Sequence, residues 1–115
     1  MTSQTPSRCD VWLVDLDPTR GHEQAGRRPA VVVSEDTLTH GAAGLSIGVP
    51  MTTRRRPVPF HVVIPAGLGG LTQDSFAKCE EVRVLSHERF IRRLGSLPPG
   101  VMEDIEDKLR VLMHL

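Results

Sequence analysis

Aromatic residues and cysteines are scarce in this chain. Its 115 residues include one tryptophan, three phenylalanines and no tyrosine, and only Cys9 and Cys79 are cysteines. The spacing of the two cysteines matches no metal-ligand pattern. No apolar run approaches the ~20 residues that span a membrane, and the first residues lack the apolar stretch of a signal peptide. These shortages predict a cytoplasmic protein with reduced thiols, no metal site and no membrane contact.

The net charge is zero, so the total charge alone gives no reason to expect a nucleic-acid partner. The distribution of charge is more informative. Twelve of the 14 basic residues are arginines, and the segment 37–73 contains no acid but carries Arg54, Arg55 and Arg56. Arginine contacts phosphate bidentately. The segment is therefore a candidate phosphate-binding surface, with an ordinary solvated surface as the alternative.

The length predicts one domain over residues 1–115, with 1–8 as a flexible tail. A helix is predicted over 87–94, with Ser86 as its N-cap, and an amphipathic helix over 101–115. About five strands are predicted, within 10–18, 29–34, 45–53, 59–65 and 75–86. Their connections are too short for parallel crossovers. The predicted fold class is mainly β with a C-terminal helix (α+β), in which a small antiparallel sheet or barrel is flanked by that helix.

The stretch GHEQAGRRPAVVVS, residues 21–34, places two arginines at the start of an apolar strand. Pro29 restricts Arg28 to an extended backbone. A P-loop is excluded because Arg27 and Arg28 stand where Lys-Ser/Thr is needed, and no helix pattern follows. An arginine held at a rigid strand start, beside a glycine-bounded loop, suits a phosphate ligand. The alternative is that both arginines only pair with carboxylates such as Asp36.

The same stretch is similar to the first signature of the MazF/PemK family of toxin endoribonucleases, G-x-E-Q-x-G-x-R-P followed by a hydrophobic strand. The segments VWLVDLDPTRG, VPMTTRRRPVPFHVVIP and DSFAKCEEVRVLS resemble further blocks of that family. The resemblance implies an SH3-like antiparallel barrel of the CcdB/PemK type, usually homodimeric. It also implies a toxin of a type II toxin–antitoxin system that cleaves single-stranded RNA without a metal or other cofactor. A cognate antitoxin protein neutralises such a toxin.

The resemblance implies that Arg28 and Thr52 are catalytic and that Glu23 is an acid of the active loop. Thr53 is adjacent to Thr52, which leaves the register open by one residue, and His22 stands where a serine is common in the family. Arg83 and Glu80 fall near the third block. The expected substrate-binding residues are Arg27, His22, Gln24, Thr53, Arg54, Arg55, Arg56 and Glu80.

RNA cleavage without a metal requires attack of the 2′-hydroxyl on the neighbouring phosphorus, with cationic and hydrogen-bond stabilisation of the charged transition state. Arg28 can stabilise that charge but cannot act as a base, because it does not deprotonate. Thr52 can donate a hydrogen bond to the phosphate. Glu23 is a candidate base, and His22, with an ordinary pKa near 6.5, is a candidate acid or base.

The aromatic residues, Trp12, Phe60, Phe76 and Phe90, lie in strand or helix patterns where core packing is expected. Base recognition would then fall to arginine planes, loop backbone and polar side chains. Two alternatives to a nuclease remain at this point. One is a CcdB-like toxin that binds DNA gyrase through its C-terminal helix, and the other is an inert SH3-like binding module. The Arg-Pro and Thr-Thr motifs favour the nuclease.

Overall fold

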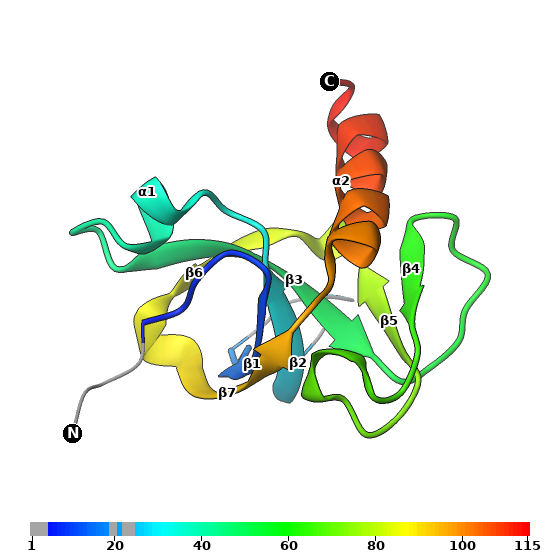
Figure 1. The fold of residues 1–115 in the computed structure, drawn as a ribbon, viewed down its shortest axis with the longest axis horizontal. Coiled ribbons are helices and arrows are strands. Elements are labelled where there is room, and N and C mark those ends of the chain that lie inside the picture. Colours follow the sequence, from blue (N-terminus) through cyan, green and yellow to red (C-terminus); the bar gives the residue numbers. More distant parts are fainter. Residues whose placement is uncertain (1–4, 19–20, 22–24) are drawn as a thin grey trace.

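The computed structural model describes residues 5–18, 21 and 25–115. These form a curled antiparallel sheet with a long C-terminal helix beside it (Figure 1). The strands are β1 (Asp10–Asp15), β2 (Arg27–Val32), β3 (Leu45–Thr52), β4 (His61–Ile64), β5 (Ser75–Lys78), β6 (Arg83–Ser86) and β7 (Phe90–Ser96). The helices are α1 (Asp36–Thr39) and α2 (Pro99–Met113), with short 3-10 turns at Leu68–Gly70, Cys79–Glu81 and His87–Arg89.

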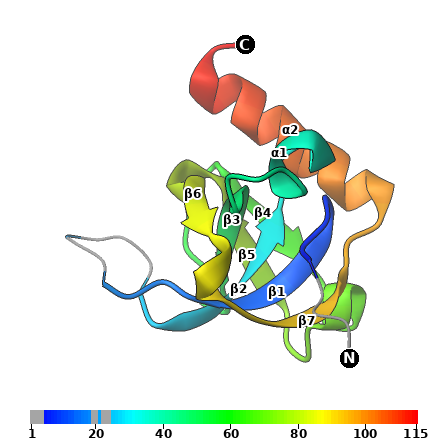
Figure 2. The same ribbon diagram turned by 90° about the vertical axis from the view of Figure 1, so that its left-hand side faces the viewer.

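The sheet has the strand order β4-β5-β3-β2-β1-β7, and β6 pairs with β3 beside this path. Each of these pairings is antiparallel. The sheet curls into an open barrel, as Figure 2 shows from the side. Among the described residues, no helix has the length and apolar character needed to cross a membrane. The predicted fold class, a small antiparallel barrel with a C-terminal helix, is confirmed.

Alternation along the central strands builds two core clusters, one on each face of the sheet. Val11, Val31 and Val49 are register partners across β1, β2 and β3, and all are fully buried in the first cluster. The second cluster includes Trp12 and its partner Ala30, which point to the other face because successive strand residues alternate. The apolar stripe of α2 packs onto the first cluster. The helix therefore covers only one face of the sheet.

The predicted helix over 87–94 is wrong. Ser86 does cap a 3-10 turn, its Oγ accepting a hydrogen bond from the Glu88 backbone N at 3.4 Å, but the chain then continues as β7 along β1. Phe90 explains the difference, because its ring packs edge-on against Trp12 with ring centroids 5.7 Å apart. Sheet pairing and this aromatic contact outweigh a local helical pattern.

The predicted single strand over 75–86 is also wrong in detail. A 3-10 turn at Cys79–Glu81 divides it into β5, which pairs with β3 and β4, and β6, which pairs with β3 alone. The buried Cys79 side chain belongs to the first core cluster and holds this turn against the sheet. The sheet therefore has seven strands rather than about five.

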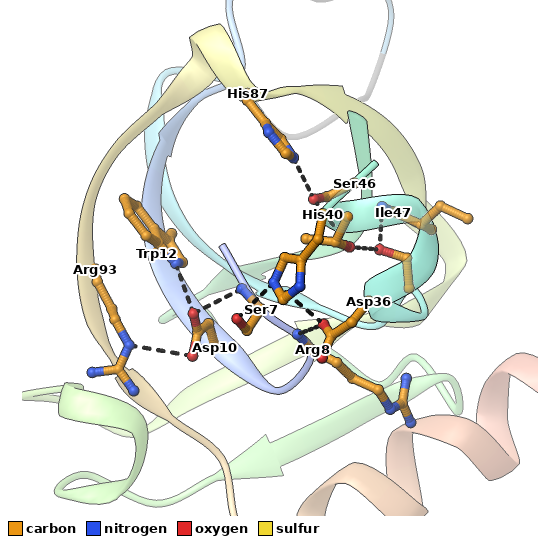
Figure 3. Close-up of polar contacts among 12 residues, drawn as sticks. Ser7, Arg8, Asp10, Trp12, Asp36, His40, Ser46, Ile47, His87 and Arg93 are labelled. Atoms are coloured by element: carbon orange, nitrogen blue, oxygen red, sulfur yellow. Dashed lines mark hydrogen bonds and ion pairs between the residues drawn. The ribbon is translucent and has the colours of Figure 1, made fainter. Parts of the chain in front are cut away.

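A group of polar contacts ties the N-terminal segment to the barrel (Figure 3). The Asp10 carboxylate accepts hydrogen bonds from the Ser7 backbone N at 2.9 Å and from Trp12 Nε1 and Arg93 Nε, each at 3.2 Å. The Arg8 guanidinium forms an ion pair with a carboxylate of α2, that of Glu106. Of the tail predicted over 1–8, residues 1–4 lie outside the described residues, and the last two are anchored by these contacts.

A second polar group lies under α1. Ser46 Oγ is 2.9 Å from His87 Nε2, and Ser34 Oγ is 2.6 Å from Thr39 Oγ1 (Figure 3). Ser46 is six residues before Thr52, the last residue of β3, which corresponds to about 20 Å along an extended strand. This network fastens α1 to the sheet near Ser46, at one end of β3. Thr52 lies at the other end of the strand, away from these contacts.

Candidate active site

A row of side chains across three neighbouring strands includes Thr52 and Phe76, and an extension of the β2–β3 register adds Arg28 to it. Thr52 and Phe76 are direct partners in the β3–β5 ladder. The β2–β3 ladder pairs Ala30 with Pro50, and continuing that register by two residues places Arg28 opposite Thr52. Residues directly opposite each other in antiparallel strands project to the same face. Extended in this way, the register would bring the predicted catalytic cation and hydroxyl to the same face of the sheet, from positions 24 residues apart in the sequence.

Arg28 is exposed near the start of β2, where the strand leaves its loop. Its Nε–H donates to the Ala25 carbonyl oxygen at 3.2 Å, which uses one of the five guanidinium N–H groups and orients the side chain. Asp36, the alternative partner considered from sequence, accepts instead from the Arg8 backbone N at 2.8 Å. An exposed, oriented guanidinium is available to a phosphate ligand.

Thr52 ends β3 and is half-buried, whereas Thr53 is exposed beyond the strand. Thr52 Oγ1 accepts a hydrogen bond from the Arg54 backbone N at 3.2 Å. Because this bond occupies an oxygen lone pair and not the hydroxyl hydrogen, Thr52 can still donate to a phosphate oxygen. The geometry favours Thr52 over Thr53 in the register that the sequence left open.

The base of the loop before β2 is clamped by four hydrogen bonds. The Leu16 backbone N donates to the Gly26 oxygen at 2.9 Å, and the Gly26 backbone N donates to Asp17 Oδ1 at 3.0 Å. Gly26 has a φ of 76°, a conformation that favours glycine. Arg89 Nη1 donates to the backbone oxygens of Asp15 and Asp17 at 3.0 and 2.8 Å. Sequence reasoning missed Arg89 because it placed this residue on a helix.

The other predicted binding residues divide into three groups. Arg27 is exposed and pairs in register with Asp15. Glu80 Oε2 is 2.9 Å from Nε2 of the buried His61, whose Nδ1 has no partner among the described residues. The contact described for Glu80 is this one with His61, and no contact described for it reaches Arg28 or Thr52. The third group, His22, Glu23 and Gln24, lies outside the described residues.

Three exposed arginines, Arg54, Arg55 and Arg56, follow Thr52 directly in the connection to β4. They lie within the acid-free segment 37–73. This placement puts a concentration of positive charge next to the row of Arg28 and Thr52. A polyanion bound at the row would meet these side chains.

Neither cysteine is suited to act as a nucleophile at neutral pH. Burial raises the pKa of the Cys79 thiol to about 12, and Glu80 adds to that rise. Burial also raises the pKa of the Cys9 thiol. A thiol must lose its proton before it attacks, so both side chains remain in the unreactive thiol form.

Comparison with known proteins decides the family. Residues 7–113 match the model of the family described as "PemK-like, MazF-like toxin of type II toxin-antitoxin system". The chain belongs to this family. The resemblance predicted from the motifs is thereby confirmed.

Two curated family members are similar over nearly the full chain. Endoribonuclease MazF9 of Mycobacterium tuberculosis is 36% identical over 113 residues, which cover 94% of this chain and 96% of the relative. The endoribonuclease toxin MazF of Escherichia coli K12 is 36% identical over 109 residues, with 94% of each chain covered.

Solved structures of the family agree with the fold. The crystal structure of MazF from Deinococcus radiodurans superposes with a TM-score of 0.87 at 31% identity, and covers 98% of this chain and 100% of that one. A MazE–MazF crystal structure from the same organism gives a TM-score of 0.81 at 30% identity, covering 98% and 99%. The open barrel with its C-terminal helix is therefore the fold of MazF-like toxins.

Proposed function

We infer that this MazF-like toxin is an endoribonuclease, and we propose that it cleaves single-stranded RNA, including mRNA, without a metal, and so inhibits translation and growth. The proposal is supported by the β2–β3 register, which, extended by two residues beyond Ala30–Pro50, puts the exposed Arg28 opposite Thr52. Relatives at 36% identity that bear the name endoribonuclease support it. Because the proposed substrate is mRNA, we propose that the toxin acts in the cytoplasm.

The proposed reaction begins with attack of a ribose 2′-oxygen on the adjacent phosphorus. The bond from phosphorus to the 5′-oxygen of the next nucleotide breaks, which leaves a 2′,3′-cyclic phosphate and a 5′-hydroxyl. Arg28 binds the non-bridging oxygens as they gain charge, and the Thr52 hydroxyl donates to one of them. Both groups act on charge that increases toward the transition state, which is the condition for raising the rate.

Two protons must move in this reaction, and neither Arg28 nor Thr52 is suited to accept one. We propose Glu23 as the base that takes the 2′-hydroxyl proton, and His22 as a group able to donate a proton to the departing 5′-oxygen. Both belong to the loop whose base is clamped through Asp17 and Arg89. These contacts hold the described residues on either side of the segment that carries Glu23 and His22.

Substrate binding rests on the exposed arginines around the row. Arg27 and the run Arg54–Arg56 would contact backbone phosphates, a contribution that is independent of sequence and weakens with salt. Gln24 and Thr53 are proposed polar contacts to the nucleotides. Glu80 keeps its predicted role only if RNA reaches the turn where it now pairs with His61.

The direct test is to incubate purified protein with a long RNA in EDTA. We expect discrete cuts, because the proposed groups need no metal. Inhibition of DNA supercoiling without any RNA cut would instead support the gyrase-binding alternative, which the family match and the endoribonuclease relatives do not favour. Absence of both effects from folded protein would support the inert binding module.

The nucleophile can be tested on one short RNA that contains a mapped cut site. Methylation of the single 2′-oxygen at that site should abolish cleavage, because the attacking group is blocked, while binding stays within a few-fold of that of the unmodified RNA. The matching all-DNA oligonucleotide should likewise remain whole. Cleavage of either modified strand at the mapped position would exclude attack by the 2′-hydroxyl.

An antitoxin protein is the second proposed partner, since solved structures of relatives include a MazE–MazF complex and an endoribonuclease with its cognate antitoxin from a mycobacterial species. We propose that an acidic, partly disordered antitoxin segment competes with RNA for Arg54, Arg55 and Arg56. An antitoxin bound to the apolar side of the barrel, distorting the site from a distance, is the alternative.

Reversing all three charges with R54E, R55E and R56E separates these alternatives. Both the affinity for RNA and the affinity for antitoxin should fall, and both should show a smaller salt dependence, because fewer counterions are released on binding. The measurement is the dissociation constant of each partner at several salt concentrations. If RNA affinity falls while the antitoxin affinity and its salt slope stay unchanged, the shared surface is disproved.

We also propose that the toxin is a homodimer. The described residues include several large apolar side chains that are exposed, among them Val84 and Ile91 on the sheet and Val111, Met113 and Leu115 on or after α2. Covering such side chains with a second copy removes apolar area from water. Light scattering at micromolar concentration should give twice the mass of the chain, and a single-chain mass would contradict this.

A further inference from the structure

The Arg55 guanidinium lies over the ring of Phe76, with its central carbon 5.1 Å from the ring centroid. This distance falls within the range of cation–π attraction. Phe76 is only 7% exposed and is the direct β5 partner of Thr52. Arg55, in contrast, is an exposed residue. Its guanidinium therefore covers an aromatic ring that stands in the same row as Thr52 and Arg28.

Two further contacts fix the position of this arginine relative to the row. The Arg54 backbone N donates to Thr52 Oγ1 at 3.2 Å, so the residue before Arg55 is tied to the end of β3. Phe76 is held from its other side by β4, where its register partner is Val63. Val63 is 51% exposed, so the row continues into apolar surface that is open to solvent.

Single-stranded nucleic-acid binders commonly stack bases on aromatic side chains. The ring of Trp12 is 5% exposed and packs on Phe90, Phe60 packs against the first core cluster, and the ring of Phe76 is covered by Arg55. Within the part of the chain that the structure describes, none of these aromatic residues is exposed: Trp12 and Phe76 are buried, and Phe60 and Phe90 are half-buried against the core clusters. An arginine plane backed by a ring offers a flat, partly desolvated substitute, because guanidinium planes also stack on bases.

We propose that Arg55, backed by Phe76, is the stacking platform for one RNA base next to the scissile phosphate, and that it contributes to the choice of cleavage site. The proposal rests on the nuclease function proposed above, because the row of Arg28 and Thr52 defines where the scissile phosphate lies. Phe76 acts as a positioning residue, since it holds the guanidinium plane and does not itself meet the RNA.

Charge and stacking can be separated by Arg55→Lys. Lysine keeps the positive charge and its attraction to the ring, but it lacks the plane on which a base stacks. Arg110→Lys is the matched control, because Arg110 is an exposed arginine on α2 that pairs with Asp107 and is not among the proposed RNA-binding residues. Since all of these side chains are exposed, both variants are expected to fold normally.

The experiment uses a short RNA that spans a mapped cut site, methylated at the attacking 2′-oxygen so that it binds without being cut. Dissociation constants are measured for the intact RNA and for a series in which one nucleotide at a time is abasic. Arg55→Lys should weaken binding of the intact RNA about tenfold, since base stacking contributes roughly 1–3 kcal/mol. Arg110→Lys should leave it unchanged, and the salt slope should stay the same in both variants.

At one position next to the cut, an abasic nucleotide should weaken binding to the unmodified protein by about the same factor as Arg55→Lys does. On that abasic RNA, the unmodified protein and Arg55→Lys should bind with equal affinity. Binding of the intact RNA that is unaffected by Arg55→Lys would overturn the proposal. The proposal would also be overturned if Arg55→Lys weakened binding by the same factor on every abasic RNA. A contact to phosphate alone would give that result, because it does not depend on any base. Failure of the unmodified protein to cut the unmethylated RNA would refute the nuclease function itself, which keeps the two failures distinguishable.

Discussion

Replacing Arg28 with alanine should lower the rate of RNA cleavage by about a hundredfold or more, which is the usual loss when one transition-state contact is removed. Arg28 is exposed, and the one side-chain hydrogen bond described for it goes to the carbonyl of the adjacent loop. The free energy of unfolding should therefore change by less than about 0.5 kcal/mol. The loss should appear mainly in kcat, because the lost contact strengthens as charge develops on the phosphate.

The measurement is single-turnover cleavage of a short RNA, with thermal unfolding as the check on folding. Arg110→Ala is the matched control, because Arg110 is an exposed arginine on α2 that pairs with Asp107 of the same helix. The control should cleave at nearly the normal rate. Normal cleavage by a folded Arg28→Ala protein would remove Arg28 from the active site.

Thr52→Ala should also reduce cleavage by about a hundredfold, because the hydroxyl that donates to the phosphate is removed. Thr52→Ser keeps the hydroxyl and should recover most of the activity. Thr53→Ala should have an effect of no more than a few-fold, since Thr53 lies beyond the last residue of β3. The comparison uses the same single-turnover assay for all three variants. If Thr53→Ala is inactive and Thr52→Ala is normal, the catalytic threonine is Thr53 and the assignment to Thr52 is wrong by one residue.

The fold was largely predictable because its central strands carry strong local signals. Val11 lies in a segment interpreted as alternating, and Val31 lies in a β-branched run. The two residues are register partners in the sheet. The amphipathic pattern of the C-terminal helix places Met102 and Ile105 in the first core cluster, as its period requires. In such segments the local pattern and the tertiary environment agree.

The prediction failed where tertiary contacts override the local pattern. The segment 87–94 has the composition of a helix, but Phe90 packs on Trp12, and the strand that begins there covers the edge of β1. The turn at Cys79–Glu81 depends on burial of the cysteine among residues distant in sequence. No local signal in the sequence could have indicated either contact.

The same distinction applies to the site. Pro29 and the neighbouring glycines indicate an arginine held at a strand start, and the resemblance to the MazF/PemK family predicts that Arg28 is catalytic. The pair Arg55–Phe76, separated by 21 positions, and the clamp from Arg89 to the backbone of Asp17 depend on how strands meet in space. Motifs therefore indicate the proposed reacting groups, whereas the supporting contacts become visible only in the folded chain.

The central claim is that Arg28 and Thr52 promote attack by a ribose 2′-hydroxyl without a metal. Identification of the ends of the RNA fragments produced in EDTA tests it most directly. Mass spectrometry of the cut oligonucleotide should show a 5′-hydroxyl on one fragment and a 2′,3′-cyclic phosphate, or its hydrolysis product, on the other. A 5′-phosphate and a 3′-hydroxyl would contradict the account, because those ends arise when water rather than the ribose attacks phosphorus.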